Sequence, residues 1–234
     1  IDQSEVIEIL KEAVKSAQKL NESSQVMTNT WLFTGPPGSG RSNAAIAFAA
    51  ALVCKEGGCS KCSDCMSTII GTHADVELIK TEGLSIKIDE IRELITRSSW
   101  APSVASYRVV VIEDSDRLTE SAANALLKVI EEPGLRTIWL LCAPTLTDVL
   151  PTIRSRCRHL SLRTPSTKAV ANLLIERESI DPKTAEFAAR AAGGHIGRAR
   201  RLATDENAKQ NRSSILKLPL TIKDVTSAYK AAQF

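Results

Sequence analysis

One glycine-rich run constrains the fold of this chain more than any other feature. Residues 35–42 read GPPGSGRS, directly after the apolar run TWLFT at 30–34 and before an alanine-rich segment at 42–53. A phosphate-binding loop has the pattern G-x4-G-K-[ST], in which backbone N–H groups and a helix N-terminus surround the phosphates. Four residues match it: Gly35, Gly38, Gly40 and Ser42. The run therefore predicts a strand, a phosphate loop and a helix in succession.

Apolar strand-like runs alternate with helical patterns through the first two-thirds of the chain. The predicted strands are 30–34, 76–79, 107–112, 137–143 and 159–162. The predicted helices between and before them are 4–20, 42–53, 88–98 and 120–130. This alternation is typical of a parallel sheet covered by helices. After Pro165 only helical patterns remain, at 166–177, 182–192 and 197–203, followed by a polar helical or linking stretch at 204–216.

The change of pattern near Pro165 predicts a division into domains. We expect an α/β domain over residues 1–163, a small helical domain over 164–205, and a linker with the start of a further domain over 206–234. The chain begins with Ile1 inside a helical pattern, so we expect a fragment of a longer protein.

Composition adds fewer constraints. The 234 residues carry a net charge of only +3, which by itself implies no partner. No apolar run approaches the roughly 18 residues of a membrane-spanning helix. Residues 151–201 contain eleven Lys or Arg against four Asp or Glu. That excess suits contact with phosphates or an acidic neighbour, and it suits an ordinary solvated helical surface equally well.

The predicted nucleotide site departs from a working one in two places. Arg41 replaces the loop lysine, and its longer, forked side chain does not match the compact ammonium group. The acidic pair expected after the strand RVVVI is Glu113-Asp114 rather than Asp-Glu, which moves each carboxylate by about one methylene group. These residues predict weak or absent ATP hydrolysis, with nucleotide binding left open. The alternative for Glu113 and Asp114 is an acidic turn that caps the next helix.

Four cysteines lie close together in the run CKEGGCSKCSDC: Cys54, Cys59, Cys62 and Cys65. Overlapping C-x2-C pairs direct thiolates at one ion, and four thiolates fill the tetrahedral shell of a structural zinc site. Gly57 and Gly58 allow a turn with positive φ that brings the chain after Cys54 back toward the other cysteines. Free thiols or disulfides are the alternative. No secretory signal is visible and we expect a cytoplasmic protein, so disulfides are not expected.

Longer blocks carry a resemblance to a known family. RVVVIEDSDRLTESAANALLKVIEEP and LLCAPTLTDVLPTIRSRCRHL, together with the cysteines, resemble the AAA+ subunits of the bacterial sliding-clamp loader. The opening IDQSEVIEIL is similar to the family's V-G-Q-x-x-V segment, with Asp2 in place of Gly. The resemblance covers residues 1–205 and implies an AAA+ parallel sheet with an inserted zinc module and a small helical lid domain.

Two branches of that family carry the zinc module. The tau/gamma branch contains the ATP-hydrolysing motor subunits, and the delta-prime branch is typically degenerate at its own nucleotide site. Arg41 and the order of Glu113 and Asp114 favour delta-prime. Gly197 agrees, because it stands where the motor branch has a nucleotide-sensing arginine, and Arg198 is rotated from it by about 100° on a helix.

The resemblance also implies a role for Arg156 in the run Ser155-Arg156-Cys157. In clamp loaders this arginine reaches the ATP site of the neighbouring subunit as an arginine finger. The implied partners are tau/gamma and delta in a hetero-pentamer, primer-template DNA through the complex, and indirectly the sliding clamp, with zinc and possible ATP or ADP as cofactors. From spacing alone, Arg154, Arg156 and Arg158 would share one face of an extended segment and make surface contacts. A motor subunit and an unrelated AAA+ DNA-binding regulator remain alternatives.

Overall fold

The computed structural model describes residues 3–19, 28–81 and 83–222, which form two compact units divided between Thr164 and Pro165. Ile1 and Asp2, at the start of the family-like opening segment, lie outside the described residues. So does the stretch 223–234, within which a further domain was expected to begin.

The first unit is built on a parallel sheet of five strands, in the order β2-β3-β4-β1-β5. The strands are β1 (Thr30–Thr34), β2 (Val76–Ile79), β3 (Arg108–Ile112), β4 (Thr137–Ala143) and β5 (Arg158–Ser161). All four neighbouring pairs are parallel. The three central strands are buried along their whole length, as expected when helices cover both faces of a sheet. The predicted parallel α/β sheet is confirmed.

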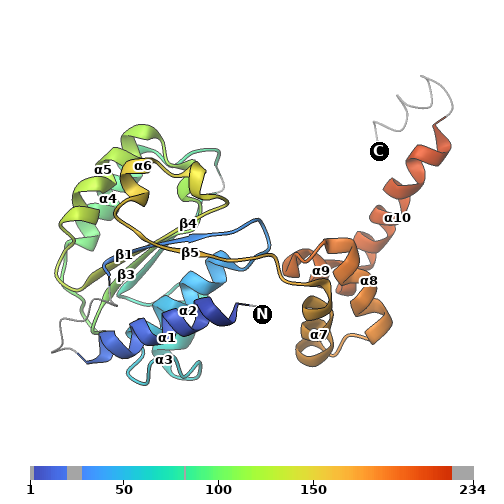
Figure 1. Cartoon of the computed structure of the whole chain (residues 1–234), viewed down its shortest axis with the longest axis horizontal. Helices are drawn as coiled ribbons and strands as arrows, with labels where there is room; N and C mark the ends of the chain where they lie inside the picture. Colours follow the sequence, from blue (N-terminus) through green and yellow to red (C-terminus); the bar gives the residue numbers. More distant parts are fainter. Residues whose placement is uncertain (1–2, 20–27, 82, 223–234) are drawn as a thin grey trace. The chain divides into compact units, whose positions relative to one another are not determined.

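Helices cover the two faces of this sheet (Figure 1). One layer contains α1 (Ser4–Gln18), α2 (Arg41–Val53) and α3 (Ser63–Ile70), and the other contains α4 (Ile88–Ser98), α5 (Glu120–Glu131) and α6 (Pro151–Arg154). Alternate residues of each strand point to opposite layers. Trp31 and Phe33 pack against α2, with the Trp31 ring 5.1 Å from that of Phe48, whereas Leu32 packs on the α4–α5 side.

The second unit is entirely helical within the described residues. It contains α7 (Thr167–Glu178), α8 (Pro182–Ala192), α9 (Ile196–Thr204) and α10 (Glu206–Thr221). Alanines and a few larger side chains, such as Val170 and Leu174, form its core. Side chains cap the first three helices: Ser166 for α7, Asp181 for α8 and His195 for α9. The predicted helical region is confirmed.

Most differences from the predicted elements are small. The sequence patterns missed α3, within the cysteine segment, and the single turn α6. Trp31 and Trp139 are fully buried in their strands, whereas Trp100, just after the end of α4, is 63% exposed. Among the described helices, none combines the length and apolar character needed to cross a membrane.

A buried carboxylate fixes the loop before β3. Asp75 is fully buried, and its carboxylate accepts hydrogen bonds from the backbone N–H groups of Ser103 (2.7 Å), Val104 (2.7 Å) and Ala105 (2.8 Å). The Ser103 hydroxyl and the Arg108 guanidinium complete the shell at 2.9 and 3.4 Å. Burial acts to raise the pKa of Asp75, but the three backbone N–H groups and the Ser103 hydroxyl lower it to about 2.

We predict that Asp75→Asn lowers the free energy of unfolding by about 2–3 kcal/mol, because its amide would place N–H bonds against backbone donors. The folded-state pKa lies below the ordinary 3.8, so the stabilisation is complete above that pH and is lost as the pH falls through about 2. Urea denaturation at neutral and acidic pH measures both effects. The control is Asp89→Asn, at a carboxylate that is 83% exposed; equal losses in the two variants would contradict the prediction.

Candidate functional site

The glycine-rich loop follows β1 and ends at the start of α2. Gly38 and Gly40 have φ values of 89° and 87°, a region that other residues rarely adopt. A Cβ atom on Gly35 would lie 2.6 Å from the carbonyl oxygen of Leu162, so only glycine fits between the loop and the end of β5. Gly40 is the N-cap of α2 and has no side chain to cap its first turn. The loop thus combines glycines of positive φ with a helix N-terminus that has no side-chain cap, two features that suit phosphate binding.

Arg41 points back to its own loop. Its Nη1 donates to the carbonyl oxygen of Gly35 at 2.7 Å, while its Nε is buried without a hydrogen-bond partner among the described residues. The guanidinium therefore contacts the backbone of its own loop, whereas the lysine of a working phosphate loop reaches phosphate oxygens.

The acidic pair lies on the same edge of the sheet as this loop. Glu113 and Asp114 directly follow β3, and β4 lies between β3 and β1. Burial raises the pKa of Cys142, near the end of β4, to about 12; the charge of Arg41 lowers it, and those of Glu113 and Asp114 raise it. The structure therefore brings Arg41, Glu113 and Asp114 together around the carboxyl end of β4, where ligands of parallel sheets bind.

A threonine, and not the acidic pair Glu113 and Asp114, caps helix α5. Thr119 is its N-cap and accepts a hydrogen bond from the backbone N–H of Ala122. Asp114 precedes a short 3-10 turn, Ser115–Arg117, and its side chain does not cap that turn. The alternative in which the acidic pair caps the next helix is therefore wrong.

Arg156 lies in the turn between α6 and β5. Its Nε donates to Glu131 Oε1 at 2.6 Å, and its Nη1 donates to the carbonyl oxygen of Thr152 at 2.8 Å. Its side chain is 40% exposed, so the guanidinium is accessible from outside the subunit. On the opposite side of the turn, the Cys157 thiol is half-buried and donates to the carbonyl oxygen of Ile153 at 3.1 Å, which anchors the turn to the core.

The expectation that the three arginines share one face of an extended segment is wrong. Pro151 starts the helical turn α6, which ends at Arg154, and the strand begins only at Arg158. Arg154 points to the carbonyl oxygen of Leu146 at 3.5 Å, and the guanidinium of Arg158 lies 4.9 Å from the centre of the buried Trp31 ring. Arg158 is therefore used in packing, and the three side chains have different surroundings.

Arg156 and the phosphate loop lie at opposite ends of the parallel strands, which we call the amino edge and the carboxyl edge of the sheet. β5 runs parallel to β1, with Arg158 opposite Trp31, so Arg156 precedes the amino end of its strand while Gly35 follows the carboxyl end of β1. At about 3.3 Å per residue, the four steps from Trp31 to Gly35 span roughly 13 Å. This separation exceeds the length of an arginine side chain. Arg156 therefore does not contact a phosphate bound in its own loop.

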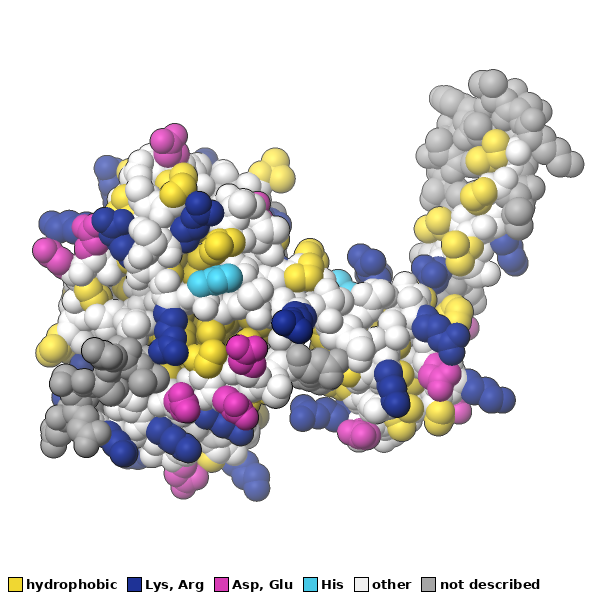
Figure 2. Space-filling view, in the orientation of Figure 1, with side chains coloured by type: hydrophobic (Ala, Val, Ile, Leu, Met, Phe, Trp, Pro, Cys, Tyr) yellow, Lys and Arg dark blue, Asp and Glu magenta, His cyan; other side chains and the backbone are white. Residues whose placement is uncertain are grey.

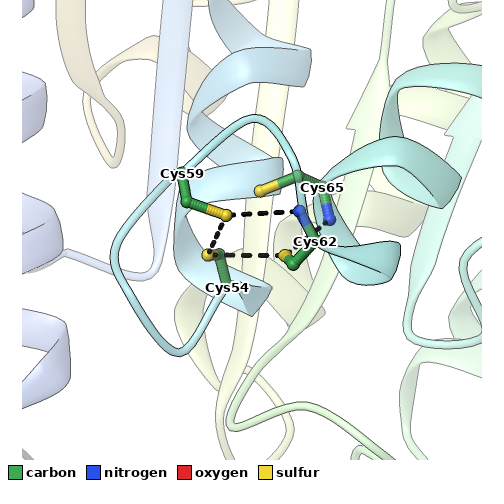
Figure 3. A group of neighbouring side chains, drawn as sticks. All are labelled: Cys54, Cys59, Cys62 and Cys65. Carbon is green, nitrogen blue, oxygen red and sulfur yellow. Dashed lines mark hydrogen bonds between the residues drawn. The ribbon is translucent and has the colours of Figure 1, made fainter.

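The four predicted cysteines form one cluster beside α2 and α3 (Figure 3). Their sulfur atoms lie within 4.8 Å of one another, and Cys54 Sγ lies 3.8 Å from Cys59 Sγ and 3.7 Å from Cys62 Sγ. Sulfurs at the corners of a tetrahedron around zinc, each about 2.3 Å from the ion, are separated by about 3.8 Å. The donor set and its spacing fit a tetrahedral metal ion, so this cluster could hold one.

Backbone N–H groups point at the sulfur atoms of the cluster. Cys62 N donates to Cys59 Sγ at 3.3 Å, and Cys65 N donates to Cys62 Sγ at 3.4 Å. Burial raises the pKa of Cys54, but backbone donors from the same loop outweigh it and lower the value to about 6. Gly57 and Gly58 have φ values of 70° and 106°, as the tight return of the chain requires. Such donors favour the thiolate, the form that binds metals. In the absence of a metal ion, burial and the neighbouring Cys62 and Cys54 side chains raise the pKa of Cys65 to about 12.

The basic stretch 151–201 is not a continuous cationic surface. Figure 2 shows Lys and Arg side chains of the helical unit interspersed with Asp and Glu. Arg190 pairs with Glu186, Arg200 with Glu178, and Arg201 with Asp205. This arrangement favours the solvated helical surface over a dedicated phosphate-binding face.

Sequence reasoning missed Glu131, the partner of Arg156. The two residues are separated by 25 positions, and no local spacing connects them. Only the arrangement of the sheet, which places the end of α5 and the turn after α6 at the same edge, brings them together.

The chain is similar in sequence to subunits of bacterial DNA polymerase III. The sequence model of the family described as "DNA polymerase III, delta subunit" matches residues 4–166. The chain is 31% identical over 195 residues to DNA polymerase III subunit delta' of Bacillus subtilis, covering 82% of this chain and 59% of that protein. It is 32% identical over 178 residues to DNA polymerase III subunit gamma/tau of Mycobacterium tuberculosis, covering 72% of this chain and 31% of that protein.

Two solved structures from Thermotoga maritima share the fold. A DNA polymerase III gamma subunit-related protein has a TM-score of 0.52 at 21% identity, covering 94% of this chain and 70% of that one. The RuvB Holliday junction branch migration motor has a TM-score of 0.60 at 18% identity, covering 100% and 69%. At these identities the similarity concerns the fold alone. With the family match over residues 4–166, the chain belongs to this DNA polymerase III subunit family and is of the delta-prime type.

Proposed function

We propose that this chain acts as a delta-prime subunit of the clamp loader in DNA replication and supplies Arg156 in trans to the ATP site of an adjacent motor subunit. The observation that carries the proposal is the position of Arg156 at the sheet edge opposite its own phosphate loop. A guanidinium that cannot reach its own nucleotide, yet remains 40% exposed, is suited to a triphosphate on another subunit. A planar, permanently charged group binds phosphate oxygens well.

The subunit's own pocket is proposed to be inactive in hydrolysis. Arg41 is bonded to the Gly35 carbonyl oxygen, and the acidic pair is in the order Glu113-Asp114. Both differences from a working site move charged groups that must lie close to the nucleotide and its metal ion. Catalysis is sensitive to displacements of about 1 Å. Gly197 supports the same conclusion, because it provides no side chain where the motor branch has its sensing arginine. The proposal leaves ATP or ADP binding without turnover possible.

The proposed partners follow from the family. The chain spans 59% of the length of the Bacillus subtilis relative, and its partners are part of the proposal. We place it in the cytoplasm, in a hetero-pentamer with tau/gamma and delta, with primer-template DNA bound through the complex and the sliding clamp contacted indirectly. The family match excludes the alternative of an AAA+ DNA-binding regulator unrelated to clamp loading, and a tau/gamma-type motor is the alternative that the ATPase rate tests.

The cysteine cluster is proposed to hold a structural zinc ion. Cys54, Cys59, Cys62 and Cys65 would supply all four ligands, which leaves no position for a reactive water. Bound there, zinc would stabilise the fold of the segment between α2 and α3.

Metal analysis tests the cluster. We predict close to one zinc per purified chain and a clear loss for Cys62→Ser, with a lower melting temperature after chelation because the segment then loses its cross-link. The matched control is Cys157→Ser, outside the cluster, which should keep its zinc. A zinc content near zero in the unmodified chain would exclude the module.

The ATPase rate of the isolated chain tests the inactive pocket. We predict background hydrolysis for the unmodified chain and for Arg41→Lys, because the reversed acidic pair remains in the variant. Phosphate release with saturating ATP and Mg²⁺ is the measurement. Turnover by the unmodified chain would favour the motor alternative.

Reconstitution of the loader tests the arginine finger. We predict that Arg156→Ala lowers the ATPase kcat of the complex by roughly 10³-fold or more at the site it serves, with assembly intact. The total rate falls less if other sites continue to turn over. The control Arg154→Ala removes a nearby positive charge and should preserve activity. Equal losses in both variants would support a general basic surface, and no loss in Arg156→Ala would refute the finger.

A further inference from the structure

The Arg156 guanidinium is held by an acidic residue of another helix. Glu131, the last residue of α5, accepts a hydrogen bond from Nε at 2.6 Å through Oε1, and the same oxygen forms an ion pair with Nη2 at 2.5 Å. Nη1 contacts the Thr152 carbonyl oxygen at 2.8 Å and the Ser155 hydroxyl at 3.2 Å. A guanidinium has five N–H bonds. The hydrogen bonds given for this guanidinium within the described residues come from Nε and Nη1, so Nη2, which is ion-paired with Glu131, offers N–H groups to an outside ligand.

Both partners are fixed to the core by their neighbours in sequence. Ile130, beside Glu131, is 6% exposed, and Ile153, in α6 three residues before Arg156, is 1% exposed. Both isoleucines belong to the same apolar cluster beneath α5 and α6. The carboxylate therefore stands at a fixed place relative to the turn, whereas the arginine side chain would otherwise sample many rotamers.

We propose that Glu131 is a positioning residue for Arg156. It occupies the Nε–Nη2 side of the guanidinium and directs the outer Nη1–Nη2 end toward a neighbour's phosphate. Nη1 then exchanges its contacts with Thr152 and Ser155 for phosphate oxygens. This inference rests on the proposed function, because it assigns Glu131 a role only if Arg156 serves a nucleotide in trans.

The exposure of the pair separates this role from a structural one. The side chains of Arg156 and Glu131 are 40% and 48% exposed, and ion pairs at such positions contribute little to folding stability. Loss of the carboxylate should therefore leave folding and assembly intact. Because ATP binds in the loop of the neighbouring subunit, the loss should lower kcat and leave the KM for ATP unchanged.

The test uses the full-length protein in the reconstituted loader. We expect Glu131→Ala to lower the ATPase kcat by roughly ten- to a hundred-fold, since misplacement of a positioned group by about 1 Å has effects of this size. Glu131→Gln retains an oxygen acceptor for the Nε–H and should retain more activity than Glu131→Ala. The matched control is Glu132→Gln at the next, exposed residue, since the described ion pair of Arg156 is with Glu131. Melting curves and gel filtration verify folding and assembly.

A double-mutant cycle gives the decisive comparison. We expect Glu131→Ala to have no further effect in a complex that already carries Arg156→Ala, because it acts through that arginine. If Arg156→Ala lowers kcat but Glu131→Ala does not, or if the two losses multiply, the role of Glu131 is overturned and the finger stands. If Arg156→Ala itself has no effect, the proposed function fails, and the role of Glu131 fails with it.

Discussion

The parallel pairing of β4 with both β3 and β1 is the constraint on which the rest of this structure depends. Strands in this arrangement share one carboxyl edge, so the loop after β1 and the acidic pair after β3 must lie near the end of β4. The buried alternation of side chains fixes the register, because a shift by one residue would turn Trp31 and Leu32 to the wrong layers. Burial of the sheet between its helices therefore also places the nucleotide-site residues.

The same pairing separates two functions in space. β5 joins the sheet beside β1 and in the same direction, which places the turn with Arg156 at the amino edge. A nucleotide-site remnant and an exposed guanidinium thus occupy opposite edges of one rigid layer. The proposed role in trans requires an assembly in which the amino edge of this chain faces the carboxyl edge of the adjacent subunit. This geometry fits the proposed function, because Arg41 contacts its own loop while Arg156 is held by Glu131 at the other end of the strands.

Much of the fold was predictable because its signals are local. A buried β-branched run such as Arg108–Ile112 and the glycine loop can each be recognised from a few consecutive residues. The spacing of the four cysteines was enough to predict that they form a cluster. The contact between Arg156 and Glu131 was not predictable, because 25 residues and the whole topology separate its partners. Arg158 was misplaced for a related reason: its interaction with Trp31 depends on the pairing of β5 with β1. Trp100 shows that an apolar residue at a helix end need not enter the core.

A structure of the assembled loader with an ATP transition-state analogue would test the central claim most directly. The account predicts that the Arg156 guanidinium lies about 3 Å from the γ-phosphate position of a nucleotide bound to the adjacent subunit. It also predicts no transition-state analogue in the Gly35–Ser42 loop of this chain. An analogue bound in that loop, with Arg156 turned to solvent, would contradict the account.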